Sequence, residues 1–334
     1  MRFIAALALS LITALPVVAQ PVVNVYSYRQ PELIKPLMDA FTAETGVQVN
    51  VAFLDKGLIE RLKAEGRRSP ADLVFTVDIS RLAGVVNAGL AQPVNSDILR
   101  GNIPANFRDP GGEWFGLTTR ARIIYASKTR VNPSDITTYK DLADPKWAGR
   151  ICTRSGTHAY MVALTAAYLL HHGPDETTAW LQAVKSNLAR RPQGNDRAQV
   201  KAIWAGECDI SIGNTYYMGQ MLSDPDQTAW ANAVNVLFPA FENGGTHVNV
   251  SGMALAKHAP NRDHAIRLME FLSGPQAQEI YAADNHEYPI APSTTASDLV
   301  QSWGTFTPDT LNLMDVAAQR AAALALTQAV DYDG

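Results

Sequence analysis

Residues 22–88 alternate between strand and helix patterns, and this order restricts the fold more than any other feature of the chain. Short apolar runs typical of buried strands lie at 22–26, 47–53 and 71–76. Apolar residues at helical spacing follow each run, at 31–45, 58–64 and 80–88. Pro31 stands where the first helix is expected to begin, and Gly46 stands where it is expected to end. Strands that alternate with helices predict an α/β fold with a parallel sheet covered by helices.

The rest of the chain continues this pattern over a length that favours two lobes. Extended strands are expected at 114–118 and 123–126, a second α/β unit begins near residue 150, and a strand at 248–255 returns to the first lobe. Helices are expected at 159–171, 263–272, 275–283 and, as one long Ala-rich helix, 311–330. Without residues 1–19, the 334-residue chain keeps 315 residues, which is too many for one typical core. We therefore predict a first lobe of 20–120 and 247–297, a second of 121–246 and 298–334, and a hinge that closes a ligand cleft between them.

Residues 1–19 have the pattern of a cleavable secretory signal. Arg2 supplies a positive start, residues 3–15 are apolar, and small residues at 17–19 precede Gln20. The apolar stretch is too short for a convincing membrane span, and an uncleaved anchor is the alternative. We expect a periplasmic protein. The formal net charge is −4 and no basic stripe is visible, so no nucleic-acid partner is expected.

The chain contains two cysteines, Cys152 and Cys208, each in an apolar, strand-like segment. In an oxidising exported compartment, two cysteines and no others most simply form one disulfide bond. Two buried free thiols are the alternative. Neither cysteine has a CxxC or His-rich neighbourhood, which argues against a zinc site.

The adjacent tyrosines Tyr216 and Tyr217 follow a short strand that contains Ile210 and Ile212. The intervening residues 213–215 are typical of a strand exit and a helix cap. Aromatic residues at such a turn occupy the usual binding edge of an open α/β sheet. Their phenol oxygens are either hydrogen-bonding groups or, when deprotonated, ligands for a hard metal ion. The residues alone leave core packing and metal binding both open.

A series of short runs in order along the chain resembles one known family. These runs are Val25–Pro31, Ser69–Leu73, Thr76–Asp78, Trp114–Arg122, Arg154–Gly156 with Tyr160, Arg191–Gly194, Asn214–Tyr217, Asn249–Gly252 and Asn285–Pro289. Through them, residues 22–292 resemble the bacterial periplasmic ferric-ion-binding proteins of iron ABC transporters. The resemblance implies a two-lobe type II periplasmic binding protein that captures Fe(III) and delivers it to an inner-membrane ABC permease. We expect such a protein to be a monomer and not an enzyme.

The family binds ferric ion through tyrosines, and the matching positions in this chain are Tyr160, Tyr216 and Tyr217. Some members add a histidine and a glutamate, where this chain has Gln30 and Val77. The resemblance therefore implies that three tyrosinates bind the iron and that carbonate or bicarbonate fills the remaining coordination positions. The residues expected to hold this anion are Arg29, Gln30, Ser155 and Arg122.

The chemistry of the ion agrees with these donors. Ferric ion is a hard trivalent acid that prefers anionic oxygen ligands. A free tyrosine has a pKa near 10, so the metal must displace the phenol protons. Three phenolates neutralise the ion, and the planar guanidinium of Arg29 is the first choice to balance the charge of the anion. Acid or reduction of the metal is expected to weaken binding.

Three further residues lie near the expected site: Tyr28, His158 and Asp78. We expect them to contact the tyrosines or the anion without binding the iron themselves. Each also has a simpler interpretation: Tyr28 as a packing residue, His158 as an exposed polar residue, and Asp78 as a helix cap or hinge residue.

Two other functions stay open from the residues. The same fold with an Arg-, Gln- and Tyr-rich cleft could hold a small organic or oxyanionic solute such as a polyamine, thiamine or a phosphonate. A tyrosine-ligated iron enzyme is the other alternative. The sequence has no Ser-His-Asp arrangement, no paired carboxylates, no P-loop and no HExxH motif, which disfavours an enzyme.

Overall fold

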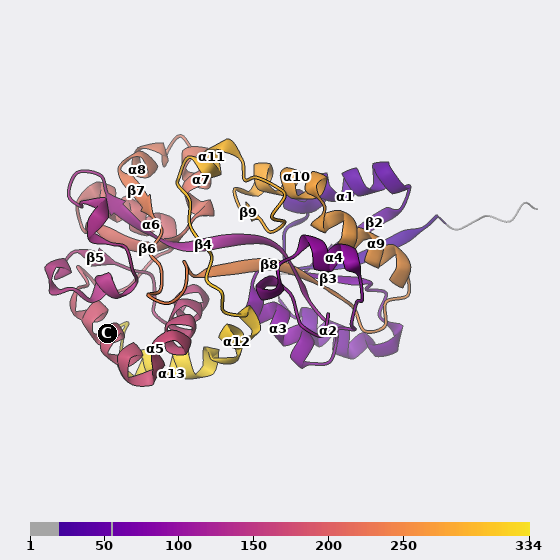
Figure 1. Cartoon of the computed structure of the whole chain (residues 1–334), viewed down its shortest axis with the longest axis horizontal. Coiled ribbons are helices and arrows are strands. Elements are labelled where there is room, and N and C mark those ends of the chain that lie inside the picture. Colours follow the sequence, from indigo (N-terminus) through magenta and orange to yellow (C-terminus); the bar gives the residue numbers. More distant parts are fainter. Residues whose placement is uncertain (1–19, 55) are drawn as a thin grey trace, which may run out of the picture.

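The computed structural model describes residues 20–54 and 56–334, so the expected signal at 1–19 lies outside the described residues. The described chain folds into two groups of strands and helices joined by long strands that run between them (Figure 1). The predicted α/β, two-lobe fold is confirmed. Among the described helices, none has the length and apolar character needed to cross a membrane.

The first lobe is built on the parallel strands expected from the sequence. β1 pairs in parallel with both β2 and β3. The bounds of this part are β1 Val22–Ser27, α1 Pro31–Thr45, β2 Gln48–Phe53, α2 Leu58–Glu65, β3 Leu73–Thr76, α3 Ile79–Asn87 and α4 Asp97–Asn102. α1 begins at Pro31 and ends at Gly46, whose left-handed backbone (φ 71°) lets its N–H bond the Thr42 carbonyl. The predicted order of elements is confirmed here.

Two long strands, β4 (Phe115–Ser127) and β8 (Val248–Leu255), run from one lobe to the other and pair antiparallel with each other. The prediction of two separate strands at 114–118 and 123–126 is wrong, because β4 is continuous. Its polar middle, residues 118–122, interrupts the apolar pattern, yet every residue of the strand is buried. β8 also pairs antiparallel with β3, so it returns to the first lobe as expected.

The second lobe continues the sheet in the order β2-β1-β3-β8-β4-β6-β5. β6 is antiparallel to β4 and parallel to β5, while β7 pairs with β4. The bounds are β5 Ile151–Cys152, α5 Ala159–Ser186, α6 Asp196–Ala205, β6 Ile210–Asn214, α7 Tyr216–Leu222, α8 Thr228–Asn232 and β7 Val234–Leu237. α5 breaks at Gly173 (φ 78°), near the end expected for the helix at 159–171. Cys152 and Cys208 form a disulfide bond within this lobe.

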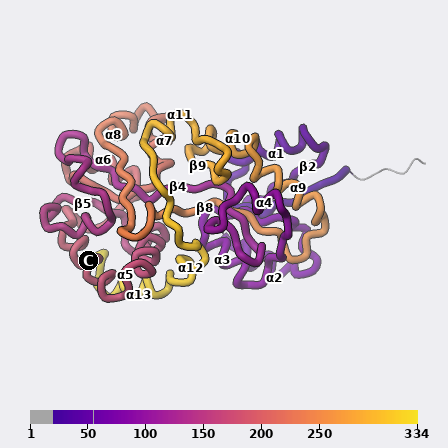
Figure 2. Tube along the Cα trace, in the orientation of Figure 1, coloured from indigo at the N-terminus to yellow at the C-terminus, as the bar shows by residue number. Residues whose placement is uncertain are grey.

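The last part of the chain passes back along both lobes, as the orange and yellow trace in Figure 2 shows. Its elements are α9 Arg262–Ser273, α10 Pro275–Asn285, β9 Tyr288–Pro289, α11 Asp298–Gln301, α12 Leu313–Ala318 and α13 Arg320–Ala329. The single helix predicted at 311–330 is wrong, because Gln319 separates α12 from α13. α12 contacts α3 as well as α5, and α13 packs on α5.

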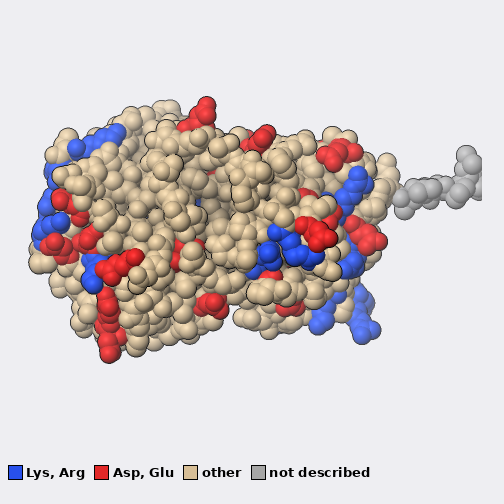
Figure 3. Space-filling view, viewed as in Figure 1, with Lys and Arg blue, Asp and Glu red and all other residues tan. Residues whose placement is uncertain are grey.

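Shorter helical turns complete the described chain, at Gly66–Arg68, Ala105–Phe107, Pro133–Asp135, Lys140–Ala143 and Pro145–Trp147. Basic and acidic side chains are interspersed on the face drawn in Figure 3, without a continuous basic stripe. Charge on this face therefore does not mark a site.

Candidate metal centre

A cavity of about 760 Å³ lies between the two lobes and contains the three tyrosines expected to bind metal. First-lobe residues that line it are Tyr28, Arg29, Gln30, Leu33, Phe53, Val77, Arg81, Arg120, Asp284, Asn285, His286 and Glu287. Second-lobe residues that line it are Tyr160, Arg197, Tyr216, Tyr217, Gln220, Ser223 and Asp224. A ligand in this cavity can therefore contact both lobes at once.

The three tyrosines meet at the starts of two helices. Tyr216 and Tyr217 open α7 directly after β6, and Tyr160 is the second residue of α5. The Tyr160 and Tyr216 hydroxyl oxygens are 3.2 Å apart. The ring centroids of Tyr216 and Tyr217 are 4.3 Å apart. The structure thus brings all three predicted ligand residues together, although they are up to 57 positions apart in the chain.

The turn into α7 differs from the predicted helix cap. Thr215 has a helical backbone, and its side chain makes no capping bond to α7. Instead its hydroxyl oxygen accepts a hydrogen bond from the Ala121 N–H of β4, at 3.3 Å. Because the helix begins at Tyr216, the two tyrosines follow helical rather than strand geometry and need not point to opposite faces. Thr215 therefore fixes the start of α7 against the long crossing strand.

Burial controls the protonation of the tyrosine pair. The pKa of Tyr216 lies well above its usual value because burial disfavours the phenolate, and the neighbouring phenols of Tyr160 and Tyr217 add to this effect. Burial also raises the pKa of Tyr217. Without a cation both groups are therefore neutral phenols at neutral pH. A nearby trivalent cation reverses this preference, since it stabilises the charged form.

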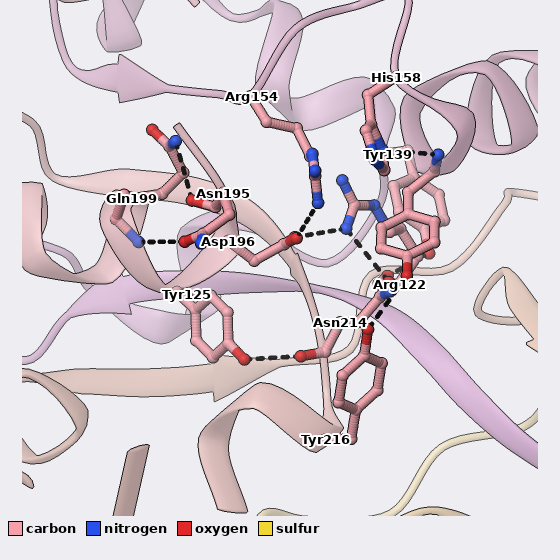
Figure 4. Close-up of polar contacts among 12 residues, drawn as sticks. Arg122, Tyr125, Tyr139, Arg154, His158, Asn195, Asp196, Gln199, Asn214 and Tyr216 are labelled. Atoms are coloured by element: carbon pink, nitrogen blue, oxygen red, sulfur yellow. Dashed lines mark hydrogen bonds and ion pairs between the residues drawn. The ribbon is translucent and has the colours of Figure 1, made fainter. Parts of the chain in front are cut away.

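Behind the tyrosines lies a buried network of charged residues (Figure 4). The Asp196 carboxylate accepts hydrogen bonds from Arg122, at 2.7 Å, and from Arg154. Arg122 also donates to the Asn214 side chain at 3.1 Å. Arg122 does not line the main cavity; it faces a separate space of about 10 Å³. The predicted anion role of Arg122 is therefore not supported by its position, because its charge is already paired with Asp196.

Ser155 also lies away from the main cavity lining. Its hydroxyl group donates to the Asp333 carboxylate at 2.5 Å, and the Gly156 N–H donates to the same carboxylate at 2.6 Å. An acidic partner in this position would repel a bound carbonate. The structure thus differs from the prediction that Ser155 holds the anion.

Arg29 lines the cavity, as expected for an anion clamp, but it has a partner. Its guanidinium forms a buried ion pair with Glu287 at 2.9 Å and donates to the Ser251 hydroxyl at 2.6 Å. Burial favours the neutral form of Glu287, yet Arg29 and Arg120 together lower its pKa below the usual range. The pair therefore stays ionised, and part of the Arg29 charge is already balanced.

Arg120 is the cavity residue that sequence reasoning missed. It donates to the Val77 carbonyl and, at 3.4 Å, to the Ser251 hydroxyl. Arg120 and Arg122 are two positions apart in β4 and so share one face of the strand. The Thr-Arg-Ala-Arg run was part of the family resemblance, and Arg122 was chosen from it. The sequence does not tell which of the two arginines reaches the cavity.

Four of the remaining expected residues have identifiable positions. Gln30 is exposed and lines the cavity at the start of α1. Tyr28 also lines it, and the Cζ atom of Arg81 is 4.2 Å from the centroid of its ring.

His158 is the N-cap of α5, where its Nδ1 accepts a hydrogen bond from the Tyr160 N–H at 3.1 Å. Burial, together with Arg154, lowers the His158 pKa to about 4, which keeps it neutral for this role. Asp78 caps α3 through the Ser80 N–H, at 2.8 Å, and does not line the main cavity.

Metal-binding clusters of the common kind are not found elsewhere in the described residues. No group of three or more His, Cys, Asp or Glu side chains in residues 20–54 and 56–334 is arranged to hold a metal ion. Within that part of the chain, the tyrosine cluster is therefore the candidate metal centre.

Comparison with known proteins agrees with this site. Residues 68–306 match the family of bacterial extracellular solute-binding proteins. The chain belongs to this family. It is 45% identical to iron uptake protein A1 of Synechocystis over 88% of this chain and 82% of that protein.

Solved structures similar to this solute-binding protein include proteins named for binding iron. Mannheimia haemolytica ferric iron-binding protein A in an open conformation is 51% identical, with a TM-score of 0.90 over 94% of this chain and 99% of that one. A Trichodesmium protein in complex with iron and citrate ligands is 40% identical, with a TM-score of 0.89 over 93% and 99% of the two chains. The predicted family and the two-lobe type II periplasmic binding protein fold are confirmed.

One contact in this solute-binding protein joins the lobes beside the tyrosines. His286 follows α10 in a left-handed conformation (φ 54°), lines the cavity and lies against Gly219 of α7. Its Nδ1 is buried and has no hydrogen-bond partner in the described structure. Sequence reasoning treated the Asn-His-Glu-Tyr run at 285–288 as a loop at the cleft edge, and did not place its histidine against the tyrosine-bearing helix.

Proposed function

We propose that the protein binds Fe(III) through the phenolate oxygens of Tyr160, Tyr216 and Tyr217. The observation that carries this proposal is the convergence of three phenols in a cavity between two lobes, with the Tyr160 and Tyr216 oxygens 3.2 Å apart. Anionic oxygen donors suit a hard trivalent ion better than nitrogen or sulfur ligands. The iron-binding relatives support the same cargo.

The remaining coordination positions go to an anion, and carbonate or bicarbonate is our proposal. Arg29 and Gln30 line the cavity from the first lobe, and Arg120 adds a second guanidinium there. A planar guanidinium matches a planar oxyanion with two hydrogen bonds. We replace Ser155 and Arg122 in this role by Arg120, because neither Ser155 nor Arg122 lines the cavity.

Transport is the proposed purpose of this binding. The lobes, 20–120 with 247–297 and 121–246 with 298–334, close around the ion, because the tyrosines belong to one lobe and the proposed anion clamp to the other. The closed, monomeric protein then delivers iron in the periplasm to an inner-membrane ABC permease. A cleft whose ion is saturated by protein and anion ligands leaves no open position for a substrate, so we propose a carrier rather than an enzyme.

The visible spectrum of the purified protein tests this proposal. Addition of ferric ion with bicarbonate is expected to produce the red-orange charge-transfer band of ferric tyrosinate. Tyr216→Phe removes one oxygen and should weaken ferric binding by more than the roughly 10- to 100-fold typical of residues that only support a ligand.

Tyr288→Phe is the matched control. The Tyr288 hydroxyl is buried without a hydrogen-bond partner in the described structure and does not line the cavity. Its removal should leave colour and affinity unchanged. A colourless wild-type protein that instead takes up an organic solute would contradict the proposed cargo.

A further inference from the structure

A single buried carboxylate links the two segments that carry the tyrosines. Asp196 is the first residue of α6, and its side chain is fully buried. It accepts hydrogen bonds from Arg122 of β4 and from Arg154, which lies in the loop before α5. Neither Asp196 nor Arg154 has a part in the proposed coordination of iron.

Both arginines lie against the ring of Tyr160. The Cζ atom of Arg154 is 5.1 Å from the ring centroid, and that of Arg122 is 5.7 Å from it. These distances are within the roughly 6 Å over which a cation interacts with an aromatic face. Arg122 also bonds Asn214, two residues before Tyr216. One carboxylate thus holds the cations beside Tyr160 and, through Arg122, the strand end that leads to Tyr216.

The charges of this network do not cancel. Two guanidinium groups share one carboxylate, which leaves one net positive charge in a buried place. The Nε atoms of both arginines and Nη2 of Arg122 have no hydrogen-bond partner in the described residues. A charge at low local dielectric acts strongly on its neighbours. The neighbour that gains negative charge in the proposed function is the Tyr160 ring.

We propose that Asp196 is a positioning residue of the ferric site: it holds the positively charged Arg154 against the Tyr160 ring, where that charge acts on the iron-bound tyrosine. The carboxylate also cancels one of the two guanidinium charges, which limits repulsion of the incoming cation. This inference rests on the proposed function, because it concerns the phenolate form of Tyr160.

Arg154→Gln tests the inference in the full-length protein loaded with ferric ion and bicarbonate. Loss of the neighbouring cation raises the energy of the phenolate electrons, so the charge-transfer band is expected to move to longer wavelength. Ferric affinity, measured by competition with citrate, is expected to fall about tenfold. Arg154→Lys keeps the charge and should return the band toward its wild-type position. A loss of packing alone would not depend on the charge in this way.

Asp196→Asn tests the positioning step itself. The Arg154 side chain is 11% exposed, so without its carboxylate it can move toward solvent and away from the ring. The band is then expected to shift in the same direction as in Arg154→Gln. If Asp196→Asn does not fold, the Arg154 variants still decide the question.

The chain offers a matched control in Arg130→Gln. Asp209 likewise binds two arginines, Arg130 and Arg150, in the same lobe, but the ring beside Arg150 is that of Trp147 and not that of a cavity tyrosine. Arg130→Gln should leave the band and the affinity unchanged. A folded Arg154→Gln protein with the wild-type band and affinity would overturn the inference while leaving the ferric site intact. A wild-type protein without any band would overturn the proposed function as well.

Discussion

In the proposed function the tyrosine hydroxyl groups change from neutral phenols to metal ligands, and the burial of Tyr216 and Tyr217 opposes the loss of their protons. Burial raises the pKa of Tyr216 and of Tyr217, so these two phenols keep their protons when no cation is bound. Only an ion of high charge can displace them at neutral pH. This requirement favours a trivalent over a divalent cation, and it means that acid competes directly with the metal.

The residues of the candidate site could be predicted in part from the sequence. Tyr216 and Tyr217 stand out because they begin a helix directly after a strand, where sheet topology places binding residues, whereas Tyr160 was expected from the family resemblance. The anion residues were harder. Arg120 and Arg122 follow the same alternation, and only tertiary packing decides that Asp196 pairs with Arg122. Ser155 was expected in the site from the family resemblance, and no local signal reveals that Asp333, 178 positions away, binds it.

His247 provides a test of stability against pH at the residue scale. It is 3% exposed, and burial lowers its pKa to about 4. The unfolded chain protonates histidine near pH 6.5, so between pH 6.5 and 4 the unfolded state binds more protons. The metal-free protein should therefore lose stability as pH falls through this window, by up to about 3 kcal/mol from this group.

His247→Gln should reduce the loss of unfolding free energy between pH 7 and pH 4.5, as measured by denaturant unfolding at the two pH values. His258→Gln serves as the control, because His258 is exposed. An unchanged pH slope in His247→Gln would contradict the account.

Helix α7 carries two of the three tyrosines, and its position depends on the elements around it. Thr215 bonds β4 at its start, while His286 from the first lobe lies on Gly219 one turn later. An added Cβ at Gly219 would lie 2.4 Å from the His286 ring, which is closer than atoms can approach. The helix therefore needs glycine there to accept this contact between the lobes.

Gly219→Ala should displace His286 or move α7, and with it Tyr216 and Tyr217. Overpacking of this type costs about 1–3 kcal/mol, and we expect ferric affinity to fall about tenfold in the same competition assay. Adding His286→Ala should restore it. Gly101→Ala is the control, since a Cβ at Gly101 meets nothing within 4 Å; equal affinities in the two alanine variants would count against the contact.

Most elements follow from local patterns, and the exceptions have physical causes. The parallel first-lobe strands were predicted because their strand patterns alternate with helix patterns along the chain. The sequence predicted two strands in place of β4, because the centre of β4 is polar and includes Arg120 and Arg122. These residues are buried although they are not apolar: Arg122 is paired with Asp196, and Arg120 lines the cavity. The expected helix at 311–330 divides at Gln319, where α12 also meets α3 of the other lobe.

At the scale of the whole molecule, one cavity collects residues from both lobes. β4 and β8 carry the chain between the lobes, and Arg120 of β4 lines the cavity where the lobes meet. The two-lobe organisation could be predicted from chain length and from the repeated α/β pattern. The way the lobes approach each other could not, because it depends on contacts such as that of His286 with Gly219, which joins segments distant in sequence.

The central claim is that three phenolate oxygens surround one ferric ion between the lobes. Crystals grown from protein loaded with ferric ion and bicarbonate, with diffraction recorded on both sides of the iron absorption edge, test it most directly. The account predicts one anomalous peak bonded to the hydroxyl oxygens of Tyr160, Tyr216 and Tyr217. A peak bonded to other residues, or a closed cleft without iron and with the three rings turned into the core, would contradict it.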